Sequence, residues 1–168
     1  IYLIGMLLCI LSIFMLVPAF VDWFYGSTNW PAFVGSSMAT LSVGSILFLT
    51  NKASATEHLE LRQAFLLTNS AWISIALFGS LPFILTDINM SFIDAFFEST
   101  SGITTTGATV IENLEAKSHG ILIWRSLLQW LGGVGIIVMA LAVLPMLSIG
   151  GMQLFKTESY ETPDKVVP

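Results

Sequence analysis

The sequence TSGITTTGATVIE, residues 100–112, is rich in small and polar side chains. Its first ten positions hold five threonines and two glycines, and strongly hydrophobic sequence lies on both sides. Irregular backbone at membrane depth is tolerated only where protein buries it or where it lines a water-filled cavity. The stretch is therefore either an external surface turn or the lining of a pore, and residue types alone leave both interpretations open.

The composition around this stretch is that of an all-α integral membrane protein. Hydrophobic residues make up 55% of the 168 positions and charged residues only 10%, whereas soluble domains carry about 25% charged residues. A crossing needs about 20 apolar residues, and backbone groups in lipid must be satisfied within a helix. Transmembrane helices are therefore predicted in the four charge-free runs 1–21, 31–50, 64–86 and 126–155.

The charge distribution predicts how these helices are oriented. Basic residues lie in the segments 51–63 and 148–168, whereas the segments 22–30 and 87–120 together hold only Lys117. By the positive-inside rule the first two segments are cytoplasmic, and so are both ends of the chain. Arg125 is expected to open the fourth helix at the outer boundary. Because the chain starts at Ile1 without a methionine, we expect a piece of a longer polypeptide.

A short helix is predicted just before the threonine-rich stretch, over residues 91–101, and it is too short to cross a bilayer. Asp94 and Glu98 lie four residues apart on it, and this unfavourable like-charge spacing indicates a solvated or pore-facing setting. A short helix, an extended threonine and glycine segment and a return to the same side would form a pore loop. Backbone carbonyls and threonine hydroxyls could then replace the hydration shell of a cation, and the negative end of the helix would point at it.

Three segments, DAFFESTSGITTTGAT, WRSLLQWLGGVGIIVMALAVLPML and GGMQLFKTE, resemble the membrane subunit of bacterial Trk-type potassium uptake systems, the TrkH family of the Trk/Ktr/HKT superfamily. In that family two leading helices precede four helix–pore-loop–helix repeats, which surround one axis and imitate a tetrameric potassium channel. The resemblance implies a leading helix pair at 1–50, a cytoplasmic loop at 51–63 and the first repeat at 64–147. Within the repeat it implies a pore helix at about 91–102 and a filter at 103–109, and the segment 148–168 would connect to a second repeat.

The same resemblance implies site residues and partners. From the residues themselves, a carboxylate on the pore helix and an arginine at the start of the next span are expected to brace the filter, so Glu98 and Arg125 would support it, although Glu98 could instead be a charge of the outer vestibule. Potassium would be the transported substrate, bound at Thr104 and Thr105, and no cofactor is implied. The implied partners are the lipid bilayer, the remaining three repeats, a second copy in a homodimer and a cytosolic nucleotide-binding regulatory subunit, all at the bacterial inner membrane. Channel-like transport and symport with a second ion both stay open, and the implied filter residues are Thr104, Thr105, Thr106 and Gly107.

Other function classes are less compatible with the sequence. A homotetrameric cation channel of single repeats would leave residues 1–50 without a role in the pore. A membrane-embedded enzyme could use Asp94, Glu98 and His119 as acid–base groups, but no nucleophile or substrate-positioning motif accompanies them. His58 and His119 have no second ligand near them in sequence, so no metal centre is expected, and the dispersed net charge of −5 argues against nucleic acid.

Overall fold

The computed structural model describes residues 1–51 and 61–137 of the chain. Residues Ile1–Gly132 form one compact unit, and the packing described below concerns this unit alone. The predictions made for most of the loop 51–63, for the end of the fourth span and for the connection 148–168 lie outside the described residues.

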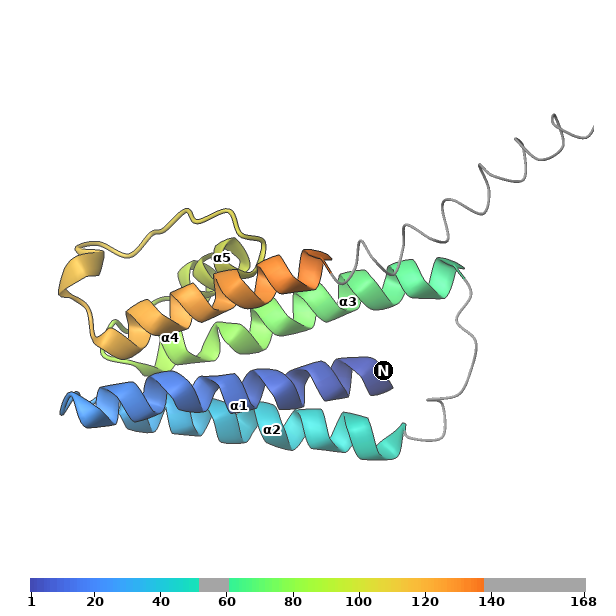
Figure 1. Ribbon diagram of the computed structural model, residues 1–168, viewed down its shortest axis with the longest axis horizontal. Coiled ribbons are helices and arrows are strands. Elements are labelled where there is room, and N and C mark those ends of the chain that lie inside the picture. The colour runs from blue at the N-terminus through green and yellow to red at the C-terminus, as the bar shows by residue number, and fades with distance from the viewer. Residues whose placement is uncertain (52–60, 138–168) are drawn as a thin grey trace, which may run out of the picture. The chain divides into compact units, whose positions relative to one another are not determined.

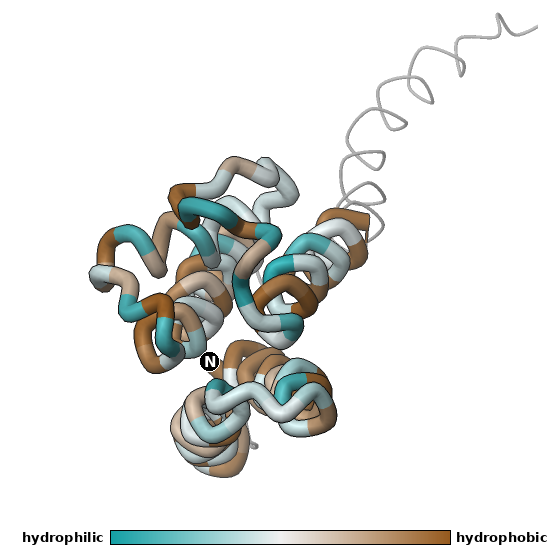
Figure 2. Tube along the Cα trace, turned by 90° about the vertical axis from the view of Figure 1, so that its left-hand side faces the viewer, coloured by the Kyte–Doolittle hydropathy of each residue, from teal (hydrophilic) through white to brown (hydrophobic). Residues whose placement is uncertain are grey.

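Four spans in the described residues are long and apolar enough to cross a membrane, and no strand occurs among those residues (Figure 1). They are α1 (Tyr2–Phe24), α2 (Trp30–Thr50), the span Phe65–Leu85 and the helix His119–Ile137. At 1.5 Å per residue, a helix of this size covers roughly the 30 Å of a bilayer core. Figure 2 shows hydrophobic residues recurring along the helices and hydrophilic stretches in the segments that join them. The predicted all-α membrane fold is confirmed.

Helices α1 and α2 pack closely because small residues lie between them (Figure 1). A Cβ atom on Gly5 would approach the backbone nitrogen of Phe48 to 2.5 Å, and one on Gly44 would approach that of Cys9 to 3.0 Å. Ser37 also donates a hydrogen bond to the carbonyl of Ser12, at 2.7 Å. Small residues of α2, among them Ser37 and Gly44, therefore form a helix-packing surface, as is usual between membrane helices.

The third span is broken near its C-terminal end into α3 (Leu61–Gly79) and α4 (Leu81–Leu85). Pro82 lacks the N–H that would continue the helical hydrogen bonds, and the N–H groups of Phe83 and Ile84 both turn back to the Ser80 carbonyl, at 3.1 and 3.3 Å. The carbonyl of Gly79 instead accepts a hydrogen bond from the buried indole of Trp124, at 3.0 Å. The carbonyl left free by the break thus connects α3 to the helix His119–Ile137 through a hydrogen bond.

The fourth span begins at His119 and not at residue 126, so Arg125 lies inside the helix and does not open it. The prediction took the first charge-free residue as the start. It was wrong because Arg125 forms an ion pair with Glu98, and a paired charge can be accommodated within a membrane helix.

The start of this helix is held by Asp22 from the end of α1. Its buried carboxylate accepts hydrogen bonds from the Gly120 N–H at 2.7 Å and from the Ser118 hydroxyl at 3.1 Å. The first N–H groups of a helix lack partners within it and favour a negative charge. Asp22 therefore fixes where the fourth span begins.

Candidate selectivity filter

The short helix predicted before the threonine-rich stretch is α5 (Phe92–Ile103). Its first residue is preceded by Ser91, whose hydroxyl donates to the Asp94 carboxylate at 2.7 Å and accepts from the Asp94 N–H at 3.2 Å. This arrangement caps the helix and fixes its beginning. Asp94 is exposed, as expected, but Glu98 is fully buried. The solvated or pore-facing setting that the charge spacing indicated for both carboxylates therefore does not hold for Glu98.

The backbone after α5 makes a tight loop in which Thr105 and Gly107 both have left-handed conformations, with φ of 59° and 79°. The Thr105 N–H donates to the Gly102 carbonyl at 2.9 Å, and the N–H groups of Thr106 and Gly107 donate to the Ser101 carbonyl at 3.0 and 3.3 Å. A left-handed conformation costs a non-glycine residue roughly 1–2 kcal/mol. These hydrogen bonds back to the end of α5 hold the loop in that conformation.

The loop leaves a row of oxygen atoms without partners. Within the described residues, the carbonyls of residues 104–107 accept no hydrogen bond, and all four residues are exposed. The Thr104 hydroxyl donates to the Thr100 carbonyl at 2.8 Å and lies 2.9 Å from the Thr106 hydroxyl. Neutral oxygens of this kind are the ligands that replace water around a potassium ion in selectivity filters. The carbonyls of Ser101 and Gly102 near the end of α5, by contrast, accept hydrogen bonds from N–H groups of the loop.

Glu98 connects three parts of the chain through one buried carboxylate. Its Oε1 accepts from Nε of Arg125 in an ion pair, and its Oε2 accepts from the Thr109 hydroxyl and the Val110 N–H, each at 3.1 Å. The Glu98 side chain has no exposed surface and that of Arg125 is 16% exposed. The structure therefore brings together Glu98, Arg125 and the segment that leaves the loop.

The helix His119–Ile137 backs the loop with close contacts. A Cβ atom on Gly102 would lie 3.0 Å from the Cβ of Leu128, and one on Gly107 would lie 3.3 Å from Nε2 of Gln129. A Cβ atom on Gly132 would overlap the Ile103 carbonyl. Gly132, the first glycine of the QWLGG motif, therefore permits the close approach of this helix to the end of α5.

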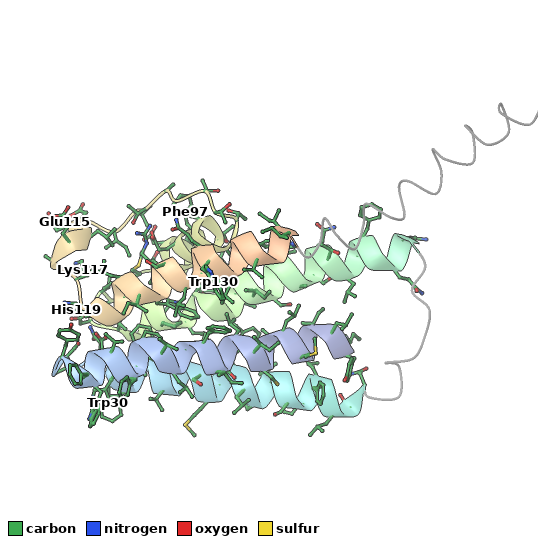
Figure 3. The ribbon with its side chains drawn as sticks, viewed as in Figure 1. Trp30, Phe97, Glu115, Lys117, His119 and Trp130 are labelled. Carbon is green, nitrogen blue, oxygen red and sulfur yellow. The ribbon has the colours of Figure 1, made fainter. Side chains whose placement is uncertain are left out.

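The three groups considered for an enzyme are not brought together. Asp94 bonds to Ser91 and Glu98 to the partners named above, while His119 stacks on Tyr25 with ring centroids 4.2 Å apart. Figure 3 shows His119 beside Glu115 and Lys117, at the end where the loop after α5 meets the helix His119–Ile137. None of the hydrogen bonds among the described residues links Asp94, Glu98 and His119.

Comparison with known proteins decides the family. Residues 29–165 match the family model described as TrkH, cation transport protein. The chain belongs to the TrkH family. This confirms the resemblance found in the sequence.

Individual members of the TrkH family align with almost the whole chain. This chain is 43% identical, over 92% of its length, to the Trk system potassium uptake protein TrkH of Halomonas elongata, and 42% identical to that of Escherichia coli K12. The crystal structure of the potassium transporter TrkH from Vibrio parahaemolyticus superimposes with a TM-score of 0.81 at 43% identity, covering 89% of this chain. The chain spans 32% of the length of these relatives. It is thus a membrane protein of a cation-transporting family.

Sequence reasoning missed two residues that shape this part of the TrkH-family chain. Ser101 accepts two N–H groups of the loop and also donates its hydroxyl to the Ala108 carbonyl, at 2.6 Å. Asp22 caps the helix that backs the loop. An acidic residue directly after a long apolar run was a signal for Asp22, but a serine among many gave no signal for Ser101.

Proposed function

We propose that this chain forms one wall of a potassium-selective pore through which potassium enters a bacterial cell across its inner membrane. The observation that carries the proposal is the row of unpartnered carbonyl oxygens at residues 104–107, on a loop whose N–H groups are bound to the end of α5. Its relatives are named potassium uptake proteins, which supports potassium as the ion. The protein moves the ion without chemical conversion, so we assign it no enzymatic activity.

The site residues follow from this proposal. Thr104 and Thr105 bind potassium, and Thr106 and Gly107 complete this wall of the filter. Glu98 and Arg125 support the filter from behind, because the Glu98 carboxylate holds both the outgoing segment and the neighbouring helix. This bracing role agrees better with the burial of Glu98 than a role as a vestibule charge does.

A single wall does not make a filter, because an ion that loses its water needs oxygens on several sides. We infer that the other walls come from three further repeats of the same polypeptide. In this division the leading pair is 1–50, the cytoplasmic loop 51–63, the first repeat 64–147 and the connection 148–168. The expected partners are a second copy in a homodimer and a cytosolic nucleotide-binding regulatory subunit.

Substituted-cysteine block tests this function in the complete polypeptide, in a cysteine-free background that includes Cys9→Ala, because Cys9 is the one cysteine of this chain. A cysteine at Thr106 should react with a small cationic thiol reagent added outside. The reaction should abolish rubidium uptake, and potassium should slow it. A cysteine at the exposed residue Glu115 should be labelled without loss of uptake. Undiminished uptake after full labelling at Thr106 would show that the loop does not line the pore.

A further inference from the structure

Ser101 lies in the last turn of α5 and holds the loop closed from both of its ends. Its hydroxyl donates to the Ala108 carbonyl at 2.6 Å, and its carbonyl accepts from the N–H groups of Thr106 and Gly107 at 3.0 and 3.3 Å. The side chain is only 5% exposed, so water does not readily replace these bonds. One buried residue thus fixes the start and the end of the segment that carries the free carbonyls.

The hydroxyl of Ser101 differs in this respect from the other hydroxyls at the end of α5. Thr100 donates to the Phe96 carbonyl of its own helix at 2.7 Å, and Thr104 donates back to the Thr100 carbonyl at 2.8 Å. These bonds stay within the end of the helix, whereas the Ser101 bond crosses the loop. Without it, the Ala108 carbonyl would lose its anchor, and the carbonyls before it could move relative to one another.

We propose that Ser101 is a specificity-determining positioning residue, whose hydroxyl sets the spacing of the carbonyls at residues 104–107 and thereby the preference for potassium over sodium. This inference rests on the proposed function. Discrimination between the two ions depends on the size and the field of the ring of oxygens. Without the hydrogen bond from Ser101 to Ala108, the end of the loop could move, and the carbonyl oxygens could close around the smaller sodium ion.

The test is the ratio of potassium to sodium uptake in the complete polypeptide, since a ratio does not depend on how much protein reaches the membrane. Ser101→Ala removes the donor and should lower the ratio about five-fold, or about 1 kcal/mol at 1.4 kcal/mol per tenfold change, the net value of a typical hydrogen bond. Ser101→Thr keeps the hydroxyl and should retain most of the ratio. Ser101→Cys, a weaker donor of similar shape, should fall between. Ser126→Ala is the matched control, because among the described residues the exposed Ser126 hydroxyl bonds only to the Leu122 carbonyl of its own helix.

Gly107→Ser, measured beside these variants, separates this inference from the proposed function. If Gly107→Ser lowers the ratio and Ser101→Ala does not, the role of Ser101 is refuted and the filter assignment stands. If neither changes the ratio, both are refuted. Should Ser101→Ala fail to insert, the comparison of Ser101→Cys with Ser101→Thr decides. A wild-type ratio for cysteine together with a lowered ratio for threonine would refute the role of the hydroxyl donor.

Discussion

At the scale of single residues, the Glu98 carboxylate accepts hydrogen bonds from Arg125, Thr109 and Val110 while its own side chain is closed off from solvent. A glutamine would offer one carbonyl oxygen where the carboxylate offers two, and its amide group would face donors. Removing one partner of a buried ion pair costs about 3–5 kcal/mol, because the remaining charge is left uncompensated. Glu98 should therefore support the structure of the loop and should not act by attracting ions.

Glu98→Gln is expected to reduce the amount of folded transporter and its selectivity, and raised ionic strength should not change the defect. Glu115→Gln is the matched control. Glu115 is an exposed acid of the loop between α5 and the helix His119–Ile137, called the outer loop below, where salt screens charges beyond about 8 Å. Rubidium uptake at several ionic strengths measures both variants. If Glu98→Gln folds normally and only raises the apparent KM for potassium, with the difference vanishing at high salt, Glu98 is a vestibule charge.

At the scale of helices, the position of the loop depends on how closely the helix His119–Ile137 approaches the end of α5. Gly132 permits this approach, because a Cβ atom there would overlap the Ile103 carbonyl. Ile103 directly precedes the exposed loop, so a shift of this contact displaces the carbonyls that follow it.

Gly132→Ala should therefore lower both the thermal stability of the protein and its potassium uptake. Gly35→Ala is the control, because a Cβ atom on Gly35 in α2 would meet nothing within 4 Å. Alanine is favoured over glycine inside a helix by up to about 1 kcal/mol, so Gly35→Ala should be neutral or stabilising. Thermal unfolding in detergent and uptake in cells measure the pair. Equal behaviour of the two variants would contradict the close contact at Gly132.

The helices also show what sequence alone could predict. A helix that crosses a lipid bilayer must be long and apolar, so the charge-free runs of the sequence indicated all four spans. The short helix α5 was predicted from the polar residues after position 90. The start of the fourth span was misplaced because it depends on two distant partners, Asp22 at Gly120 and Glu98 at Arg125. Contacts between residues far apart in the chain leave no periodic pattern. The hydrogen bonds of Ser101 are local, to residues 106–108, but they depend on the irregular backbone of the loop, which also leaves no periodic pattern in the sequence.

At the scale of the whole molecule, the orientation inferred from the basic residues places the outer loop outside the cell. Glu115 and Thr50 are exposed residues in the outer loop and at the end of α2. In a cysteine-free background of the complete polypeptide that includes Cys9→Ala, a cysteine at Glu115 should react with an impermeant thiol reagent added to intact cells, whereas one at Thr50 should react only after the cells are opened. The reverse pattern would overturn the orientation. Ser118 would be a poorer reporter, because its hydroxyl bonds to the Asp22 carboxylate.

If residues 104–107 form a wall of a potassium filter, a substitution at Gly107 should change which ion the pore prefers. Gly107 has φ of 79°, and a Cβ atom there would lie 3.3 Å from the Gln129 side chain. Because glycine tolerates this backbone conformation better than other residues do, a serine would strain the loop and shift the carbonyl of residue 107. Gly26, between α1 and α2, has a similar φ of 70° but open space around it, which makes Gly26→Ser a control with the same backbone strain. The measurement is rubidium uptake competed by sodium in the complete polypeptide. The expected result is that sodium competes more strongly in Gly107→Ser and as in the wild type in Gly26→Ser. Unchanged competition in a well-expressed Gly107→Ser variant would contradict the claim.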